Sequence, residues 1–255
     1  PKLADYEDYL FMVMHAVDFT RKEKFATTEL DLVMGKDYIV TYHRAPLRSV
    51  TSLRDRAAKN TTLAPRGPDR IAHTLLDLMI DNYMPVLDEL RAELEEIEEM
   101  VLHKTSSTEN FMQEMLHARA DFSKLRQIVR PQRDVIERLA RGDTKMIRNT
   151  LLPYYRDLRD NLARFEDMAT SYHERLLMSF DIYLNKAAFE ANEGIKFLTA
   201  LTAITIPVMV VGTWYGMNFE AMPELRGRYS YYTAAGLVLV FTTLTYIYLK
   251  RKRWF

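Results

Sequence analysis

The chain has 255 residues and a formal net charge of zero, with 35 Lys and Arg against 35 Asp and Glu. This balance argues against a nucleic-acid partner, because domains that bind nucleic acid usually carry an excess of basic residues. Cysteine is absent, which excludes a disulfide framework and any thiolate metal site.

Residues 1–60 are predicted to form what remains of a small α/β sheet domain on the cytoplasmic side. Residues 6–20 are apolar and aromatic and predict one strand, and residues 29–43 predict two strands around the turn at Gly35. The first residue is Pro1 rather than Met, so we expect the chain to begin inside a longer natural protein. Strands followed by long helices predict an α+β domain that is N-terminally incomplete.

Residues 61–142 are predicted to form a cytoplasmic helical hairpin. The first helix begins at about Asp69, and a second runs from about 109 to 141, passing Pro131. The order of these helices predicts that they are antiparallel neighbours. The first helix has an apolar seam with the 3, 4, 3, 4 spacing of a coiled coil, formed by Leu87, Leu90, Leu94, Ile97 and Val101.

A single long helix is predicted from about Pro153 to Trp214. Within it, Gly and Pro occur only at Gly194, Pro207 and Gly212, and no loop signal separates charged sequence from apolar sequence. We divide it into a cytoplasmic stalk at 143–196 and a membrane span at 197–217. A helix of roughly 60 residues is about 90 Å long, enough to leave the cytoplasm and cross a bilayer.

Two uncharged runs, at 197–217 and 229–249, each have the length that crosses a bilayer core. A hairpin buried in a soluble core is the alternative. The basic tail at 250–255 follows the second run, and clustered basic residues beside a span indicate the cytoplasmic side. We therefore predict a multi-pass protein of the cell (inner) membrane, in contact with the lipid bilayer, with both termini cytoplasmic and the loop 218–228 outside.

The motifs of common enzyme classes are missing from the sequence. It has no GxxxxGK[ST] phosphate loop, no GxGxxG and no GxSxG, and its His residues lack paired metal-ligand spacing. We therefore predict no enzyme activity and no nucleotide partner. A run of glutamates at 93–99 is interpreted as a solvated face of the coiled coil rather than as a cation site.

One narrow, mildly polar stripe follows the first span and the helix that leads into it. Small hydroxyls on such a helix indicate either helix–helix packing or the lining of a pore, and two spans enclose a path only when several copies assemble. Carboxamides at Asn192 and Asn218 would lie at opposite ends, and a ring at Ile195 and Leu198 would close the path by dewetting. The stripe positions are Asn192, Ile195, Thr199, Thr202, Ile206, Met209 and Thr213.

The loop sequence YGMNFEAMPEL at 215–225 resembles the signature of CorA-type divalent-cation channels. NEGIKFLTALTAITIP at 192–207, both spans and the basic tail are also similar to that family. The resemblance implies a homopentamer, arranged as a funnel of long helices, that carries Mg²⁺ into the cytoplasm, with Co²⁺ and Ni²⁺ as further substrates. It assigns the selectivity filter to Gly216, Met217 and Asn218, and places Glu220 and Glu224 at the outer mouth.

The same resemblance implies a regulatory Mg²⁺ site between subunits, made of carboxylates. It places Asp157 in that site, with Asp18 near the position of the partner carboxylate. Two residues depart from the family pattern, since Ile195 replaces a Met at the first hydrophobic ring and Met209 replaces a hydroxyl residue. Three functions remain open: a Mg²⁺ channel gated by Mg²⁺, a related transporter of Co²⁺, Ni²⁺ or Zn²⁺, and a non-conducting, membrane-anchored coiled-coil scaffold.

Overall fold

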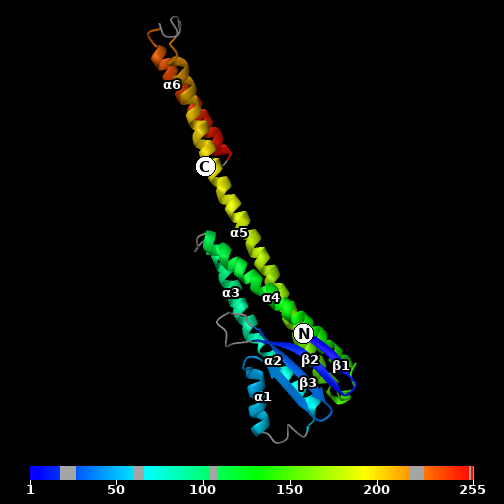
Figure 1. The fold of residues 1–255 in the computed structure, drawn as a ribbon. Helices are drawn as coiled ribbons and strands as arrows, with labels where there is room; N and C mark the ends of the chain where they lie inside the picture. Colours follow the sequence, from blue (N-terminus) through cyan, green and yellow to red (C-terminus); the bar gives the residue numbers. More distant parts are fainter. Residues whose placement is uncertain (18–26, 60–65, 104–107, 219–226, 253, 255) are drawn as a thin grey trace. The chain divides into compact units, whose positions relative to one another are not determined.

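We describe the protein from a computed structural model, in which residues 1–17, 27–59, 66–103, 108–218, 227–252 and 254 are placed well enough to describe. The chain divides into two compact units, 1–181 and 182–255, and the long helix α5 (Leu152–Tyr215) contributes to both. Figure 1 shows the order of the elements along the chain. Each unit is described by itself below.

The first unit begins with a four-stranded antiparallel sheet in the order β1-β2-β3-β4. Its strands are β1 (Lys2–Tyr6), β2 (Tyr9–Val17), β3 (Thr27–Gly35) and β4 (Ile39–His43). The two strands predicted around Gly35 are confirmed. The strand predicted at 6–20 is confirmed as β2 at 9–17, but its beginning is wrong, because Tyr6 belongs to β1; residues 18–20 lie outside the described residues. The chain turns at Glu7 and Asp8, so that Tyr6 pairs with Tyr9, and two polar residues of this kind favour a tight hairpin connection.

The core lies on one face of this sheet, under helices. Alternate residues of β2 and β3 point into it because side chains alternate between the faces of a strand. Helix α2 (Pro68–Asp81) packs on β2, β3 and β4, and α4 (Thr108–Arg141) packs on β1 and β2. The core side chains of the two strands, each no more than 1% exposed, are Leu10, Met12, Met14, Leu30, Leu32 and Met34.

The helices follow the predicted pattern with two differences. The predicted helical hairpin is formed by α4 and α3 (Tyr83–His103), and all five residues of the predicted seam are buried. The helix expected to continue from Asp69 is interrupted at Asn82, because Pro85 has no N–H to donate and its ring crowds the carbonyl of residue 81. Helix α1 (Arg48–Lys59) was not predicted; it packs on α2.

A buried polar network joins the sheet to the helical hairpin. The Tyr83 hydroxyl donates to the His15 carbonyl at 2.7 Å, and the Gln132 amide donates to the Tyr83 hydroxyl at 2.8 Å. The His15 backbone N–H donates to the Gln132 side-chain oxygen at 3.3 Å, which closes the circuit. Burial raises the pKa of Tyr83, so the hydroxyl keeps its proton for donation at neutral pH.

We expect Tyr83→Phe to lower the free energy of unfolding by about 1–3 kcal/mol, because the Gln132 amide and the His15 carbonyl lose a buried partner. Urea unfolding of the purified chain in detergent, followed by circular dichroism, measures this difference. Tyr42→Phe is the matched control, since Tyr42 is 63% exposed and its side chain lies outside the core. An equal effect of both substitutions would contradict the network's role.

The second unit consists of the C-terminal part of α5, from Ile182 onward, and the helix α6 (Ser230–Arg251). Both helices line one apolar groove, whose residues include Val211, Tyr215, Tyr231 and Val238, so they lie side by side. The less exposed positions of α6 recur every three or four residues, at Ser230, Ala234, Val238, Thr242, Thr245 and Leu249. The corresponding positions of α5 are Lys196, Ala200, Ala203, Ile204, Pro207, Val211 and Tyr215.

Candidate ion path and regulatory position

The predicted stripe lies on the side of α5 that turns away from α6. Every stripe residue, and Leu198 beside them, is exposed within the single chain. At about 100° per residue, the middle of the stripe is roughly 140° around the helix from the middle of the α6-facing side. The stripe is therefore free to face other molecules, whereas α6 occupies the opposite side of α5.

Two threonines of the stripe, Thr199 and Thr202, use their hydroxyl hydrogens within the helix. Thr199 donates to the Ile195 carbonyl at 2.8 Å, and Thr202 donates to the Leu198 carbonyl at 2.9 Å. This satisfies the donors without a partner from another chain, as is common for Thr in helices. Each of these two hydroxyl oxygens keeps lone pairs that can accept a hydrogen bond from outside the helix.

The predicted filter lies where α5 ends. Gly216 still donates to the Gly212 carbonyl at 3.0 Å, Met217 donates to the Trp214 carbonyl at 3.4 Å, and Asn218 follows, exposed, outside the helix. A Cβ on Gly216 would lie 3.0 Å from the Gly212 carbonyl oxygen, so glycine lets the chain turn off the helix here without crowding. Glu220 and Glu224 lie outside the described residues, as does Asp18.

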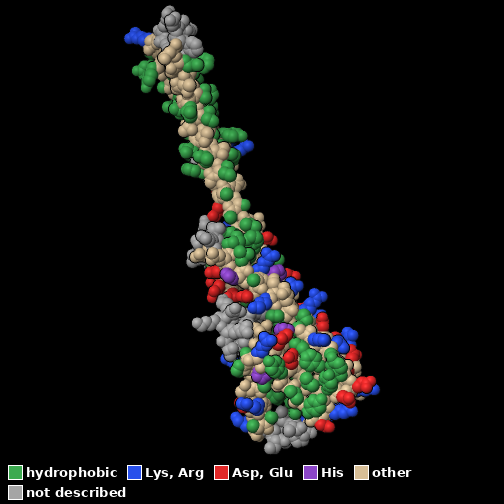
Figure 2. Space-filling model, viewed as in Figure 1, with side chains coloured by type: hydrophobic (Ala, Val, Ile, Leu, Met, Phe, Trp, Pro, Cys, Tyr) green, Lys and Arg blue, Asp and Glu red, His purple; other side chains and the backbone are tan. Residues whose placement is uncertain are grey.

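Both helices of the second unit are long and apolar enough to cross a membrane. Few of their side chains are buried within the chain, so they do not resemble the core helices of a soluble protein. Figure 2 shows hydrophobic side chains along this segment, with Lys and Arg at its ends. Near the end of the two helices that carries the GMN triplet, the exposed aromatic residues are Trp214, Tyr229, Tyr231 and Tyr232, where interfacial anchors are expected.

The predicted regulatory residue Asp157 lies in the first turns of α5, within the first unit. Its side chain is exposed, and no hydrogen bond or ion pair to it is found among the described residues. It is close enough to act electrostatically on His73 of α2. Burial lowers the pKa of His73, while the Tyr154 carbonyl, Asp77 and Asp157 act in the opposite direction.

A buried carboxylate fixes the start of α5 against α2. Asp69 is 4% exposed; one of its oxygens accepts from the Arg148 Nε at 2.7 Å and the other from the Arg148 Nη2 at 2.6 Å. It also accepts from the backbone N–H of Arg148 and of Arg70, and its own carbonyl accepts from the Tyr155 hydroxyl at 3.1 Å. Burial alone would raise the pKa of Asp69, but the hydrogen bonds and charge of Arg148 hold it below its ordinary value.

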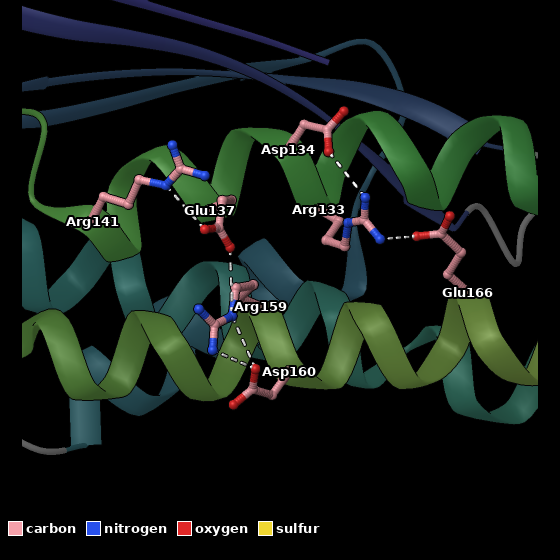
Figure 3. A network of polar contacts seen from close by, with 7 residues as sticks. All are labelled: Arg133, Asp134, Glu137, Arg141, Arg159, Asp160 and Glu166. Carbon is pink, nitrogen blue, oxygen red and sulfur yellow. Dashed lines mark hydrogen bonds and ion pairs between the residues drawn. The ribbon is translucent and has the colours of Figure 1, made fainter.

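A network of charged side chains then holds α5 beside α4, just beyond Asp157 (Figure 3). Arg133 pairs with Glu166 at 2.7 Å, and Arg159 lies 3.6 Å from Glu137. Further along, Arg175 forms two hydrogen bonds to Glu98 of α3. Since partly exposed ion pairs contribute little stability, the network acts mainly by fixing how α5 lies against α3 and α4.

No group of three or more His, Cys, Asp or Glu side chains within the described ranges is arranged to hold a metal ion. A regulatory ion at Asp157 would therefore need ligands from outside these ranges or from another subunit.

The comparisons with known proteins identify the family. The sequence model of the CorA-like Mg²⁺ transporter proteins matches residues 1–251. The chain belongs to this family. The resemblance drawn from GMN, the loop, the two spans and the tail is thereby confirmed, and the family is one of transporters.

Relatives of this CorA-family chain match along its whole length. YfjQ of Bacillus subtilis is 30% identical over 255 residues, which make up 100% of this chain and 78% of that protein. The cobalt/magnesium transport protein CorA of Thermotoga maritima is 25% identical over 256 residues, covering 100% of this chain and 72% of that protein.

A solved structure shows the same fold. The complete structure of the CorA magnesium transporter from Methanocaldococcus jannaschii has a TM-score of 0.85 at 23% identity, covering 100% of this chain and 80% of that chain. At this identity the likeness concerns the fold. It confirms the combination of a sheet domain, long helices and two apolar helices predicted from the sequence.

Asp69 and Arg148 were not predicted from the sequence as positioning residues of this CorA-family chain. The only local signal was an acidic residue after Pro68 in the first turn of α2, which is a common helix start. Their pairing joins residues 79 positions apart, so periodicity does not reveal it.

We expect Asp69→Asn to lower the free energy of unfolding by about 1–3 kcal/mol at neutral pH, because Arg148 loses its charged partner. The folded-state pKa of Asp69 is depressed, so its contribution is full above the unfolded-state pKa of about 4 and is lost as the pH falls through the folded value. Urea unfolding between about pH 3 and pH 7 measures the difference between variant and wild type. It should shrink in acid; a constant difference, or the same loss for the exposed control Asp134→Asn, would contradict this account.

Proposed function

We propose that this chain forms a homopentameric channel for the passive uptake of Mg²⁺, driven by the membrane potential and closed by cytoplasmic Mg²⁺. Membership of the CorA-like Mg²⁺ transporter family supports the transport of a divalent metal ion. No ATP is required, because an ion with two charges gains about 4–5 kcal/mol across 100 mV.

The position of the stripe is the observation that carries this proposal. Its side chains turn away from α6 and expose acceptor oxygens and apolar groups, and two helices alone cannot enclose a path. Copies arranged around an axis with these faces inward enclose one. The lining would be Asn192, Ile195, Leu198, Thr199, Thr202, Ile206, Met209 and Thr213.

In this arrangement the two ends of the path perform different tasks. Asn218 presents a ring of carboxamide oxygens at the outer mouth, next to Gly216 and Met217. Because Mg²⁺ gives up its water reluctantly, oxygens that bind a hydrated ion avoid the cost of dehydration. At the inner end, Ile195 and Leu198 form apolar rings that block the path when it loses water.

The charges flanking the spans support the orientation. Lys250, Arg251 and Lys252 end α6, and basic residues beside a span favour the cytoplasmic side. Both ends of the chain are then cytoplasmic, in the cell (inner) membrane. The loop with Glu220 and Glu224 faces outward, where their charges would attract cations.

We expect Asn218→Ala to reduce Mg²⁺ influx into proteoliposomes by at least about tenfold, because the carboxamide ring is lost while the helices remain. An internal Mg²⁺ dye measures the influx, and size-exclusion chromatography with light scattering confirms the oligomer. Asn149→Ala is the matched control, since Asn149 is exposed in the short 3-10 helix η2 (Asn149–Leu151). Normal influx through Asn218→Ala would refute the filter role.

The regulatory part of the proposal concerns Asp157. Its exposed carboxylate lies on a segment of α5 that Asp69 and the α4 ion pairs hold in place. Bound Mg²⁺ would neutralise facing carboxylates of neighbouring subunits and hold the ring closed, and its loss would restore their repulsion. Asp18 remains the proposed partner.

We expect Asp157→Ala to raise the internal Mg²⁺ concentration needed for half-maximal closure by at least about threefold, because one ligand is lost at each interface. Influx measured against a series of internal Mg²⁺ concentrations gives this dose response. Asp167→Ala is the matched control, because Asp167 is also exposed on α5 and forms no hydrogen bond or ion pair with the described residues. Identical dose responses for wild type and Asp157→Ala would remove Asp157 from the sensor.

Two other functions make different predictions in the same assay. A related transporter of Co²⁺, Ni²⁺ or Zn²⁺ would carry those ions in preference to Mg²⁺, and the Thermotoga relative is named as a cobalt/magnesium transport protein. A non-conducting scaffold would show no flux of any of these ions, with the oligomer intact. Flux measured ion by ion in the same vesicles separates the three.

A further inference from the structure

The C-terminal end of α6, away from the GMN loop, carries three consecutive cations that have no ion-pair partner among the described residues. Lys250 and Arg251 occupy the last turn of the helix and Lys252 follows it, and all three are exposed. None of them forms a salt bridge with any described residue. By contrast, Lys196 of α5 pairs with Glu193 at 2.6 Å.

The distance of these cations from the groove at the other end of the hairpin can be counted along the helix. Tyr215 of α5 and Tyr231 of α6 line the same groove. Lys196 precedes Tyr215 along α5 by the same number of residues as Lys250 follows Tyr231 along α6. At 1.5 Å per residue both lie about 28 Å from that groove, which is close to the thickness of a bilayer core. The cluster therefore lies at the depth of lipid headgroups.

Two backbone hydrogen bonds join Lys252 and Trp254 to the end of α6. The Lys252 N–H donates to the Tyr248 carbonyl at 3.1 Å, and the Trp254 N–H donates to the Leu249 carbonyl at 3.1 Å. A bond that spans five residues in this way is typical of a helix-ending motif with an apolar residue after it. These bonds tie the backbone of Lys252 and of Trp254, whose side chain is half-buried, to the last turn of α6.

The same end of α6 presents an exposed apolar surface. Leu244, Ile247 and Tyr248 are 57%, 49% and 58% exposed, and the Lys252 ammonium lies 5.3 Å from the centre of the Tyr248 ring. Lys252, which follows the last residue of α6, therefore lies beside this exposed surface. A partner that fits this surface has an apolar part that lies along α6 and a negatively charged group near the C-terminal end of the helix.

We propose that Lys250, Arg251 and Lys252 form a binding surface for anionic phospholipid headgroups, with Trp254 beside the upper part of the acyl chains. Charge complementarity selects an anionic lipid over a zwitterionic one, because each cation near a membrane surface attracts negative headgroups. The proposal goes beyond ion transport, and its test does not use flux.

The two tryptophans of the chain, Trp214 and Trp254, lie at opposite ends of the hairpin, so Trp214→Phe leaves Trp254 as the only tryptophan. The full chain with this change is placed in phosphatidylcholine vesicles in which part of the lipid is brominated phosphatidylglycerol or brominated phosphatidylcholine. Brominated acyl chains quench an indole on contact. We expect phosphatidylglycerol to be preferred at Trp254 by at least about threefold, and about 1 M salt to reduce the preference.

The triple change Lys250→Gln, Arg251→Gln and Lys252→Gln should bring the preference to about one. The control triple Lys36→Gln, Lys59→Gln and Lys145→Gln removes three exposed charges from the first unit and should leave the preference unchanged. Lys252→Gln alone should give an intermediate value, which keeps the test valid if the triple variant does not fold. Equal quenching by both lipids, as expected if the tail instead pairs with carboxylates of a second copy, would overturn the proposal, as would an unchanged preference in the triple variant.

Discussion

The structure depends on one constraint: inside hydrocarbon, each backbone N–H and C=O must find its partner within the protein. A helix meets this demand by itself, so the sequence from Leu152 to Tyr215 can pass from a charged segment to an apolar one without a break. The hydroxyls of Thr199 and Thr202 follow the same rule, since they bond to carbonyls one turn earlier. The rest of the candidate path follows from which side of that helix α6 covers.

The start of α5 is held by interactions of another kind. Asp69 is almost fully buried and accepts hydrogen bonds from Arg148, while Tyr155 of α5 donates to its carbonyl. The ion pairs of Figure 3 then join α4 to α5 at a more exposed level. Asp157, the carboxylate proposed to respond to Mg²⁺, thus lies on α5 between the buried hydrogen bonds of Asp69 and the more exposed ion pairs with α4.

The sequence was informative where a pattern is local and repeated. Helix α5, the seam of α3 and the two apolar helices have periodicities or lengths that few other structures share. The sequence of the GMN loop likewise predicts the family. The sequence was less informative where one or two residues determine the end of an element, as at the turn of Glu7 and Asp8 or at the helix break before Pro85. It did not reveal the pairing of Asp69 with Arg148, because two residues far apart in the chain leave no periodic signal. The partner of Asp157 also remains a prediction, because Asp18 lies outside the described residues.

The hydrogen bonds that the Thr199 and Thr202 hydroxyls donate within their own helix have a consequence for whether cations or anions would pass. In a path lined by the stripe, an anion at these positions would meet only oxygen lone pairs, with no hydroxyl hydrogen to bind. A cation surrounded by water brings its own hydrogens, which those oxygens accept. Discrimination against chloride would then require no charged residue in the membrane, and the cost of burying one would be avoided.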